Sequence, residues 1–129
     1  MELDPTLIPP LRDTLRGYDN VEIIHGDILA LDLDVLMCPC GQAVNYLVVA
    51  NIPYYITSAL MRHLLETSCA PERLVLTVQE EVAERICAEA GELSLLALSV
   101  QVYGRPEIIG RIPAEAFYPP PKVDSAILY

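Results

Sequence analysis

The chain has 129 residues, of which 53% are apolar, and it carries a formal net charge of −10. This length allows one domain at most, and the apolar content excludes a disordered tail. A single lysine, Lys122, and seven scattered arginines argue against a protein that grips RNA by itself, because such proteins carry a basic patch.

Nothing in the chain indicates a membrane span, because its apolar runs stay near strand length and are broken by charges or prolines. Met1 is followed by Glu2 and Asp4, the opposite of the basic start of a signal peptide. We therefore expect the protein to be cytoplasmic. Cysteines are kept reduced in the cytoplasm.

The four cysteines do not form a metal-binding pattern. Cys38 and Cys40 are separated by one residue rather than two, and the two histidines, His25 and His63, are isolated in the sequence. Zinc sites use C-x-x-C pairs or cysteines close to histidines. No metal site is expected.

The first part of the chain predicts a helix and a strand. Asp4 can cap a helix whose first position is Pro5, and Gly17 would end it. The apolar face of this helix would consist of Leu7, Ile8, Leu11 and Leu15. Val21 to Ile24 reads as a short strand, and residues 30–46 are expected to form an irregular connection.

The middle of the chain predicts strands that alternate with helices. The wholly apolar run Leu47 to Ala50 is typical of a strand in the interior of a parallel sheet. A helix over about 58–66, capped by Thr57 or Ser58, precedes a strand at Leu74 to Val78. An amphipathic helix should follow at Glu80 to Ala90 and stop at Gly91, with a buried face of Val82, Ala83, Ile86 and Cys87.

After Gly91 the pattern changes to strands alone. They are expected at Leu93 to Val102, Glu107 to Ile112 and Ser125 to Tyr129, separated by glycine and proline. Strand–helix units followed by strands predict an α/β fold whose sheet has an antiparallel edge. Residues 1–129 would then form one domain.

The segment with the most chemistry is Asn51-Ile52-Pro53-Tyr54-Tyr55, which directly follows the apolar strand. Ligands of open α/β sheets bind at the carboxyl ends of the strands. This segment offers an amide acceptor beside an aromatic ring. A second aromatic ring lies in a rigid frame near the far end of the chain, Phe117-Tyr118-Pro119-Pro120-Pro121-Lys122-Val123-Asp124-Ser125.

Together these segments resemble the ribosomal RNA adenine dimethyltransferases, S-adenosylmethionine-dependent enzymes that place two methyl groups on the exocyclic amine of adenine. The resemblance runs from Met1 to Tyr129 and rests on five blocks in order, namely Glu2 to Pro5, Gly26 to Leu29, Asn51 to Ser58, Val78 to Arg85 and Phe117 to Ser125. It implies a Rossmann-like methyltransferase fold. The implied function is methyl transfer to adjacent adenines of small-subunit ribosomal RNA during ribosome biogenesis.

The resemblance implies that Asn51 and the backbone carbonyl of Ile52 accept hydrogen bonds from the target amine. The lone pair of this amine is delocalised into the ring, and two acceptors favour its tetrahedral, nucleophilic form. Pro53 confines Ile52 to extended geometry, and positioning supplies most of the catalysis. Tyr54 and Phe117 would stack on the two faces of the base once it has left its helix.

Cofactor and RNA contacts are implied in the same way. Glu2 would accept hydrogen bonds from the ribose of S-adenosylmethionine, and Asp27 from its adenine amine. Ile28 would offer its backbone N–H to the adenine ring, and Asn51 would also border the cofactor. Lys122 would meet an RNA phosphate.

Other residues of the blocks are given structural roles. Tyr55 is expected to pack rather than stack. Glu80 and Glu81 are expected to serve mainly as favourable charges in the first turn of their helix. The family usually has a Tyr-Gly pair before a Leu-Ser-Val strand, where this chain has Leu95 and Leu96.

The resemblance also implies parts that are missing from residues 1–129. These are a strand and a Gly-rich loop before the acidic block at Glu2, and a helical RNA-binding domain after Tyr129. Two alternatives stay open: an adenine methyltransferase of large-subunit RNA or DNA, and a fragment with no activity of its own. A missing central strand would leave an open sheet edge, so self-association is expected.

Overall fold

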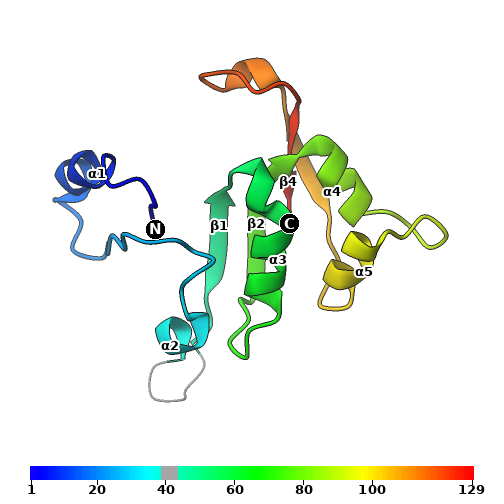
Figure 1. Ribbon diagram of the computed structural model, residues 1–129, viewed down its shortest axis with the longest axis horizontal. Coiled ribbons are helices and arrows are strands. Elements are labelled where there is room, and N and C mark those ends of the chain that lie inside the picture. The colour runs from blue at the N-terminus through cyan, green and yellow to red at the C-terminus, as the bar shows by residue number, and fades with distance from the viewer. Residues whose placement is uncertain (39–43) are drawn as a thin grey trace. The chain divides into compact units, whose positions relative to one another are not determined.

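The computed structural model describes residues 1–38 and 44–129. They form two compact units, Met1–Asp32 and Leu33–Tyr129. Figure 1 shows helix α1 in the first unit and a sheet with its helices in the second. No helix in the described part of the chain is long and apolar enough to cross a membrane.

The helix of the first unit begins later than predicted. Asp4 closes a turn instead of capping the helix, because its Oδ1 accepts hydrogen bonds from the backbone N–H (2.8 Å) and the hydroxyl (2.6 Å) of Thr6. Helix α1 (Ile8–Leu15) follows, with Pro9 and Pro10 in its first turn. Prolines are tolerated there because the first N–H groups of a helix have no partner within it.

The predicted strand at Val21 to Ile24 is wrong. In its place a single parallel bridge joins Glu2 to His25. The N–H of Glu2 donates to the carbonyl of Ile24, and the N–H of Gly26 donates to the carbonyl of Glu2, both at 3.0 Å. The partner of residues 24–26 is the short segment around Glu2, so these hydrogen bonds do not extend into a ladder between two strands.

The second unit contains a four-stranded sheet in the order β1-β2-β4-β3. Its strands are β1 (Leu47–Asn51), β2 (Arg73–Gln79), β3 (Ile108–Ile112) and β4 (Ser125–Leu128). β1 and β2 are parallel, whereas β4 is antiparallel to both β2 and β3. The predicted α/β fold with an antiparallel edge is confirmed.

Strand β1 lies at the edge of this sheet and not in its interior. It pairs with β2 alone in the described structure, and the side chains of Leu47 and Val49 are 60% and 75% exposed. The prediction of an interior strand is therefore wrong for this unit. An uninterrupted apolar run does not reveal whether both neighbours of the strand are present.

Among the described residues, four α-helices accompany the sheet, namely α2 (Leu33–Met37), α3 (Thr57–Leu65), α4 (Glu80–Ile86) and α5 (Leu95–Gln101). α4 packs on β2, β3 and β4, while α5 packs on α3 and α4 (Figure 1). The buried core includes Leu60, Met61, Leu64, Leu76, Val78, Ala83, Ile86, Ala97, Val100, Ala126 and Leu128.

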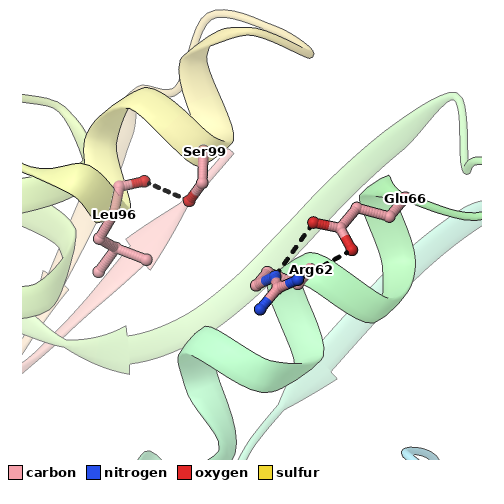
Figure 2. A network of polar contacts seen from close by, with 4 residues as sticks. All are labelled: Arg62, Glu66, Leu96 and Ser99. Atoms are coloured by element: carbon pink, nitrogen blue, oxygen red, sulfur yellow. Dashed lines mark hydrogen bonds and ion pairs between the residues drawn. The ribbon is translucent and has the colours of Figure 1, made fainter.

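The strand predicted at Leu93 to Val102 is wrong, because helix α5 occupies these residues. Ser94 caps this helix, and its hydroxyl accepts a hydrogen bond from the N–H of Ala97. Ala97 and Val100 are buried while Leu95 is 84% exposed, which is the spacing of a helix. Leu98-Ser99-Val100 is thus helical, and the Ser99 hydroxyl donates to the carbonyl of Leu96 (2.8 Å; Figure 2).

The other predicted helices are confirmed with changed ends. α4 stops at Ile86 rather than Ala90, and Gly91, at φ 109°, follows a further turn. Thr57 does not cap α3, because its hydroxyl donates to the carbonyl of Tyr54 (3.0 Å). On the exposed face of α3, Arg62 forms an ion pair with Glu66 one turn later (Figure 2).

Helix α2 was not predicted, and it bears on the cysteines. Asp34 in α2 accepts hydrogen bonds from the Thr67 hydroxyl and from the N–H of Cys69. These bonds hold residues 67–69 near α2. Cys38 and Cys69 form a disulfide with their Cα atoms 6.3 Å apart. The expectation of reduced cysteines is not met by this pair. Cys40 lies outside the described residues.

Candidate functional site

The predicted catalytic and stacking residues line one pocket of the second unit. β1 ends at Asn51, and the 3-10 helix η2 (Tyr54–Ile56) follows after Ile52 and Pro53. A second 3-10 helix, η3 (Ala114–Ala116), leads into Phe117. The cavity measures about 340 Å³ and is lined by Asn51, Ile52, Pro53, Tyr54, Phe117, Tyr118, Pro119 and Pro121.

The backbone between Ile52 and Tyr54 leaves one carbonyl oxygen available. The carbonyl of Pro53 accepts a hydrogen bond from the N–H of Ile56 (3.1 Å), and that of Tyr54 accepts from Thr57. The carbonyl of Ile52 accepts none from the part of the chain that the structure describes. The Asn51 side chain is exposed at the strand end and is likewise without a partner among these residues. Two acceptors are thus available beside the cavity.

The two aromatic rings are held differently. Tyr54 is half-buried, and its hydroxyl lies 2.7 Å from the hydroxyl of Ser125 at the start of β4. Phe117 is also half-buried, and the cis peptide bond between Tyr118 and Pro119 follows it. Tyr55 is 83% exposed, so the expectation that it packs is wrong.

The acids that follow β2 do not line the pocket. Glu80 and Glu84 both form ion pairs with Arg111 of β3. The N–H of Glu80 donates to the carbonyl of Asp124 (3.0 Å), which ties the start of α4 to the start of β4. Lys122 is exposed in the loop just before β4.

Three of the predicted cofactor residues, Glu2, Asp27 and Ile28, lie in the first unit, where adjacent segments bring Glu2 and Asp27 close in the fold, whereas Asn51 belongs to the second unit. Glu2 Oε1 accepts the N–H of Asp4 (2.8 Å), and Asp27 Oδ1 accepts the N–H of Leu29 (2.9 Å). The other oxygen of each carboxylate has no partner among the described residues. Two carboxylates that keep a free acceptor fit a ligand that presents hydroxyls and an amine. Ile28 is half-buried beside Asp27.

Asp4 differs from these two acids. The hydroxyl of Thr6, followed by its backbone N–H, lowers the pKa of Asp4. Its carboxylate is therefore engaged in the turn, in agreement with a structural role. Among the described residues, no group of three potential metal ligands is assembled.

A model of the family described as "Ribosomal RNA adenine dimethylase" matches residues 1–129 of the chain. The chain belongs to this family. A relative from Dehalococcoides mccartyi (strain CBDB1), "Ribosomal RNA small subunit methyltransferase A", is 48% identical over 99% of this chain and 43% of the relative. A relative of the same name from Latilactobacillus sakei is 45% identical over 98% of this chain and 44% of the relative. The chain thus spans less than half of the length of these relatives.

Two solved structures have the same fold. A dimethyladenosine transferase from Plasmodium falciparum matches with a TM-score of 0.83 and 29% identity, over 98% of this chain and 44% of that one. The 23S rRNA methyltransferase ErmE matches with a TM-score of 0.77 and 32% identity, over 98% of this chain and 48% of that one. The methyltransferase fold implied by the resemblance is confirmed.

The sequence did not indicate every residue of the pocket. Tyr118, Pro119 and Pro121 line it, although Tyr118 is fully exposed and only the stiffness of the prolines was predicted. The contact between Ser125 and Tyr54 spans 71 residues of sequence. A serine at the start of a predicted strand was the one available signal, and it does not name the partner.

Proposed function

We propose that this chain carries the catalytic part of an rRNA adenine N6,N6-dimethyltransferase. The observation that carries the proposal is the common pocket of Asn51 to Tyr54 and Phe117, which come from distant parts of the sequence. The pocket combines two acceptors with two rings. These are the groups that a flipped adenine with an exocyclic amine requires.

The acceptors act on the amine. Asn51 Oδ1 and the Ile52 carbonyl accept its two hydrogens, which favours the tetrahedral nitrogen and exposes its lone pair. Pro53 restricts Ile52 to extended geometry and so aims that carbonyl. No strong base is required, because the product ammonium is acidic, and orientation supplies most of the rate gain.

The rings hold the base. An adenine that leaves its helix loses its stacking, and aromatic contacts restore about 1–3 kcal/mol per base. Tyr54 and Phe117 supply such contacts from η2 and from the loop after η3. Lys122, exposed in the same loop, is suited to an RNA phosphate.

S-adenosylmethionine, when bound, supplies the electrophilic methyl group. Glu2 and Asp27 would hold it through the ribose hydroxyls and the adenine amine, with the N–H of Ile28 at the ring. The free carboxylate oxygens of the first unit support this assignment.

We assign the substrate to small-subunit ribosomal RNA, in the cytoplasm. The names of the curated relatives support this choice. Similarity to ErmE keeps large-subunit RNA as the second candidate.

A chimera tests the proposal. This chain would replace the matching segment of the Dehalococcoides mccartyi relative, and tritium transfer from S-adenosylmethionine to unmethylated small-subunit particles would be measured. We expect dimethyladenosine in the product, with large-subunit particles as the control. A folded chimera that methylates neither particle, or only the large one, would contradict the assignment.

A further inference from the structure

The dipeptide Asp124-Ser125 occupies a central place in the second unit. Ser125 begins β4, the strand between β2 and β3, and it pairs with Gln79 on one side and Ile112 on the other. Its side chain is fully buried. A residue fixed from both sides is among the most rigid points that a sheet offers.

Ser125 holds the first ring of the pocket. Its hydroxyl lies 2.7 Å from the hydroxyl of Tyr54, which is at the far end of the ring from the backbone. The backbone end of Tyr54 is held by Thr57, which donates to its carbonyl. With both ends fixed, the plane of the Tyr54 ring has little freedom.

Asp124 holds the second ring through the backbone. Its Oδ1 accepts the N–H of Ala114 (2.8 Å), the first residue of η3. The N–H of Phe117 in turn donates to the carbonyl of Ala114 (3.2 Å). The position of the Phe117 ring therefore depends on the Asp124 carboxylate.

We propose that Asp124 and Ser125 are positioning residues that set the gap between the Tyr54 and Phe117 rings to the thickness of one base. Neither lines the pocket, so both act through the rings. Dispersion contacts weaken steeply once carbon atoms separate beyond about 3.5–4.0 Å, so a small change of the gap loosens one face. The inference rests on the proposed function, because it assumes that the pocket takes adenine.

The chain offers a specific probe of this gap. Phe117 is its one phenylalanine, so 4-fluorophenylalanine gives a single fluorine resonance that reports on this ring alone. In chains labelled instead with 3-fluorotyrosine, the resonance of Tyr54 is identified as the one that Tyr54→Phe removes. Adenosine is the ligand, and titration followed by fluorine NMR gives its dissociation constant.

Matched substitutions separate the hydrogen bonds from general packing. Ser125→Thr and Ser125→Val add nearly the same volume, but only threonine keeps the hydroxyl. We expect Ser125→Val to shift the Tyr54 resonance and to weaken adenosine binding about fivefold relative to Ser125→Thr. Tyr54→Phe should weaken binding similarly, and combining it with Ser125→Val should add little. Tyr55→Phe, which removes an exposed hydroxyl, is the control.

For Asp124, the pair is Asp124→Asn, which keeps an acceptor, and Asp124→Ala, which does not. Only Asp124→Ala should shift and broaden the Phe117 resonance. If Ser125→Val matches Ser125→Thr in Tyr54 resonance and affinity, or if Asp124→Ala leaves Phe117 unchanged, the positioning role is refuted. Failure of the unsubstituted chain to bind adenosine contradicts the proposed function instead, and the resonances without ligand then decide the positioning role.

Discussion

At the scale of single residues, the turn that begins at Pro53 determines which carbonyl oxygens between Ile52 and Tyr54 remain free. Its own carbonyl closes the η2 turn by accepting the N–H of Ile56, and the next carbonyl is taken by Thr57. Ile52 lies before the turn, and its oxygen accepts no hydrogen bond from the described residues. The carbonyls of Pro53 and Tyr54 are thus engaged in the turn, while the carbonyl of Ile52 stays available beside Asn51.

Substitution of Asn51 tests the role of the second acceptor. In the chimera with the Dehalococcoides mccartyi relative, Asn51→Ala should lower kcat about a hundredfold, because the amine loses orientation at the chemical step. Cofactor affinity, measured by calorimetry, should survive. Asn45→Ala, an exposed position before the same strand, is the control. Loss of cofactor binding with an unchanged rate at saturation would show that Asn51 was misassigned.

Asp27→Ala should show the opposite pattern in the same chimera. Removal of the carboxylate takes away an acceptor for the cofactor, so the apparent KM for S-adenosylmethionine should rise about tenfold or more. The rate at saturating cofactor should change little. Steady-state kinetics at varied cofactor concentration measure both quantities, and a lowered kcat with unchanged KM would contradict the role.

The pocket residues were predictable because a strand end and a local motif place four of them together. Asn51 to Tyr54 are neighbours in sequence, whereas the role of Phe117 was predicted only from the resemblance to the family. The link from Ser125 to Tyr54 was not predictable, since a hydroxyl pair carries no pattern in sequence. The exposure of a side chain was also not predictable from the sequence, since Tyr55 is exposed although it was expected to pack.

At the scale of elements, α5 shows the limit of reading an apolar run. Residues 93–102 are mostly leucine and valine, so their hydrophobic pattern favours neither the period of a helix nor that of a strand. The decisive signal was Ser94, a helix cap that was read as part of a strand. Where helix and strand patterns compete, the cap residue carries more information than the hydrophobic content.

The cap of α5 can be tested directly. Ser94→Ala should lower the free energy of unfolding by about 0.5–2 kcal/mol, because the N–H of Ala97 loses its acceptor. Ser99→Ala is the matched control, since its hydroxyl donates to a carbonyl within the same helix (Figure 2) and should matter less. Urea denaturation measures both variants. Equal losses would show that Ser94 does not act as a cap.

The contact between α2 and the 67–69 segment should depend on pH. The Thr67 hydroxyl, the first of several hydrogen-bond donors, lowers the pKa of Asp34 from its usual 3.8. A lowered pKa in the folded state adds stability above the unfolded pKa, and this stability is lost as the pH falls through the folded value. The melting temperature of the native chain should therefore exceed that of Asp34→Asn at pH 7. The difference should shrink below about pH 4. A difference that is constant from pH 7 to pH 3 would contradict this origin.

At the scale of the whole molecule, the open edge of β1 is the main liability. Its free side pairs with no strand in the described structure, and Leu47 and Val49 add exposed apolar surface. The run Leu47 to Ala50 contains none of the charges or prolines by which edges are usually protected. Such an edge can recruit another chain.

We expect the 129-residue chain to self-associate at micromolar concentration through β1. Val49→Lys should reduce association, since a charge at an edge opposes pairing. Val102→Lys is the control, because Val102 is 77% exposed but lies beyond α5 and not on the sheet. Light scattering and sedimentation measure the outcome. A monomer in which the Val48 and Val49 amides are strongly protected from exchange would contradict it.

Strand β4 comes last along the sequence yet lies between β2 and β3. During synthesis, β2 is made well before Ser125, so the pairing of β2 with β4 joins segments that are far apart in the sequence. Closing such a long loop is slow, and folding rates fall as contacts become less local. The hydroxyl of Tyr54 reaches that of Ser125 only when β4 pairs with β2. The pocket should therefore be the last part of the unit to become ordered, and a pulse of hydrogen exchange during refolding would find η2 protected later than α3.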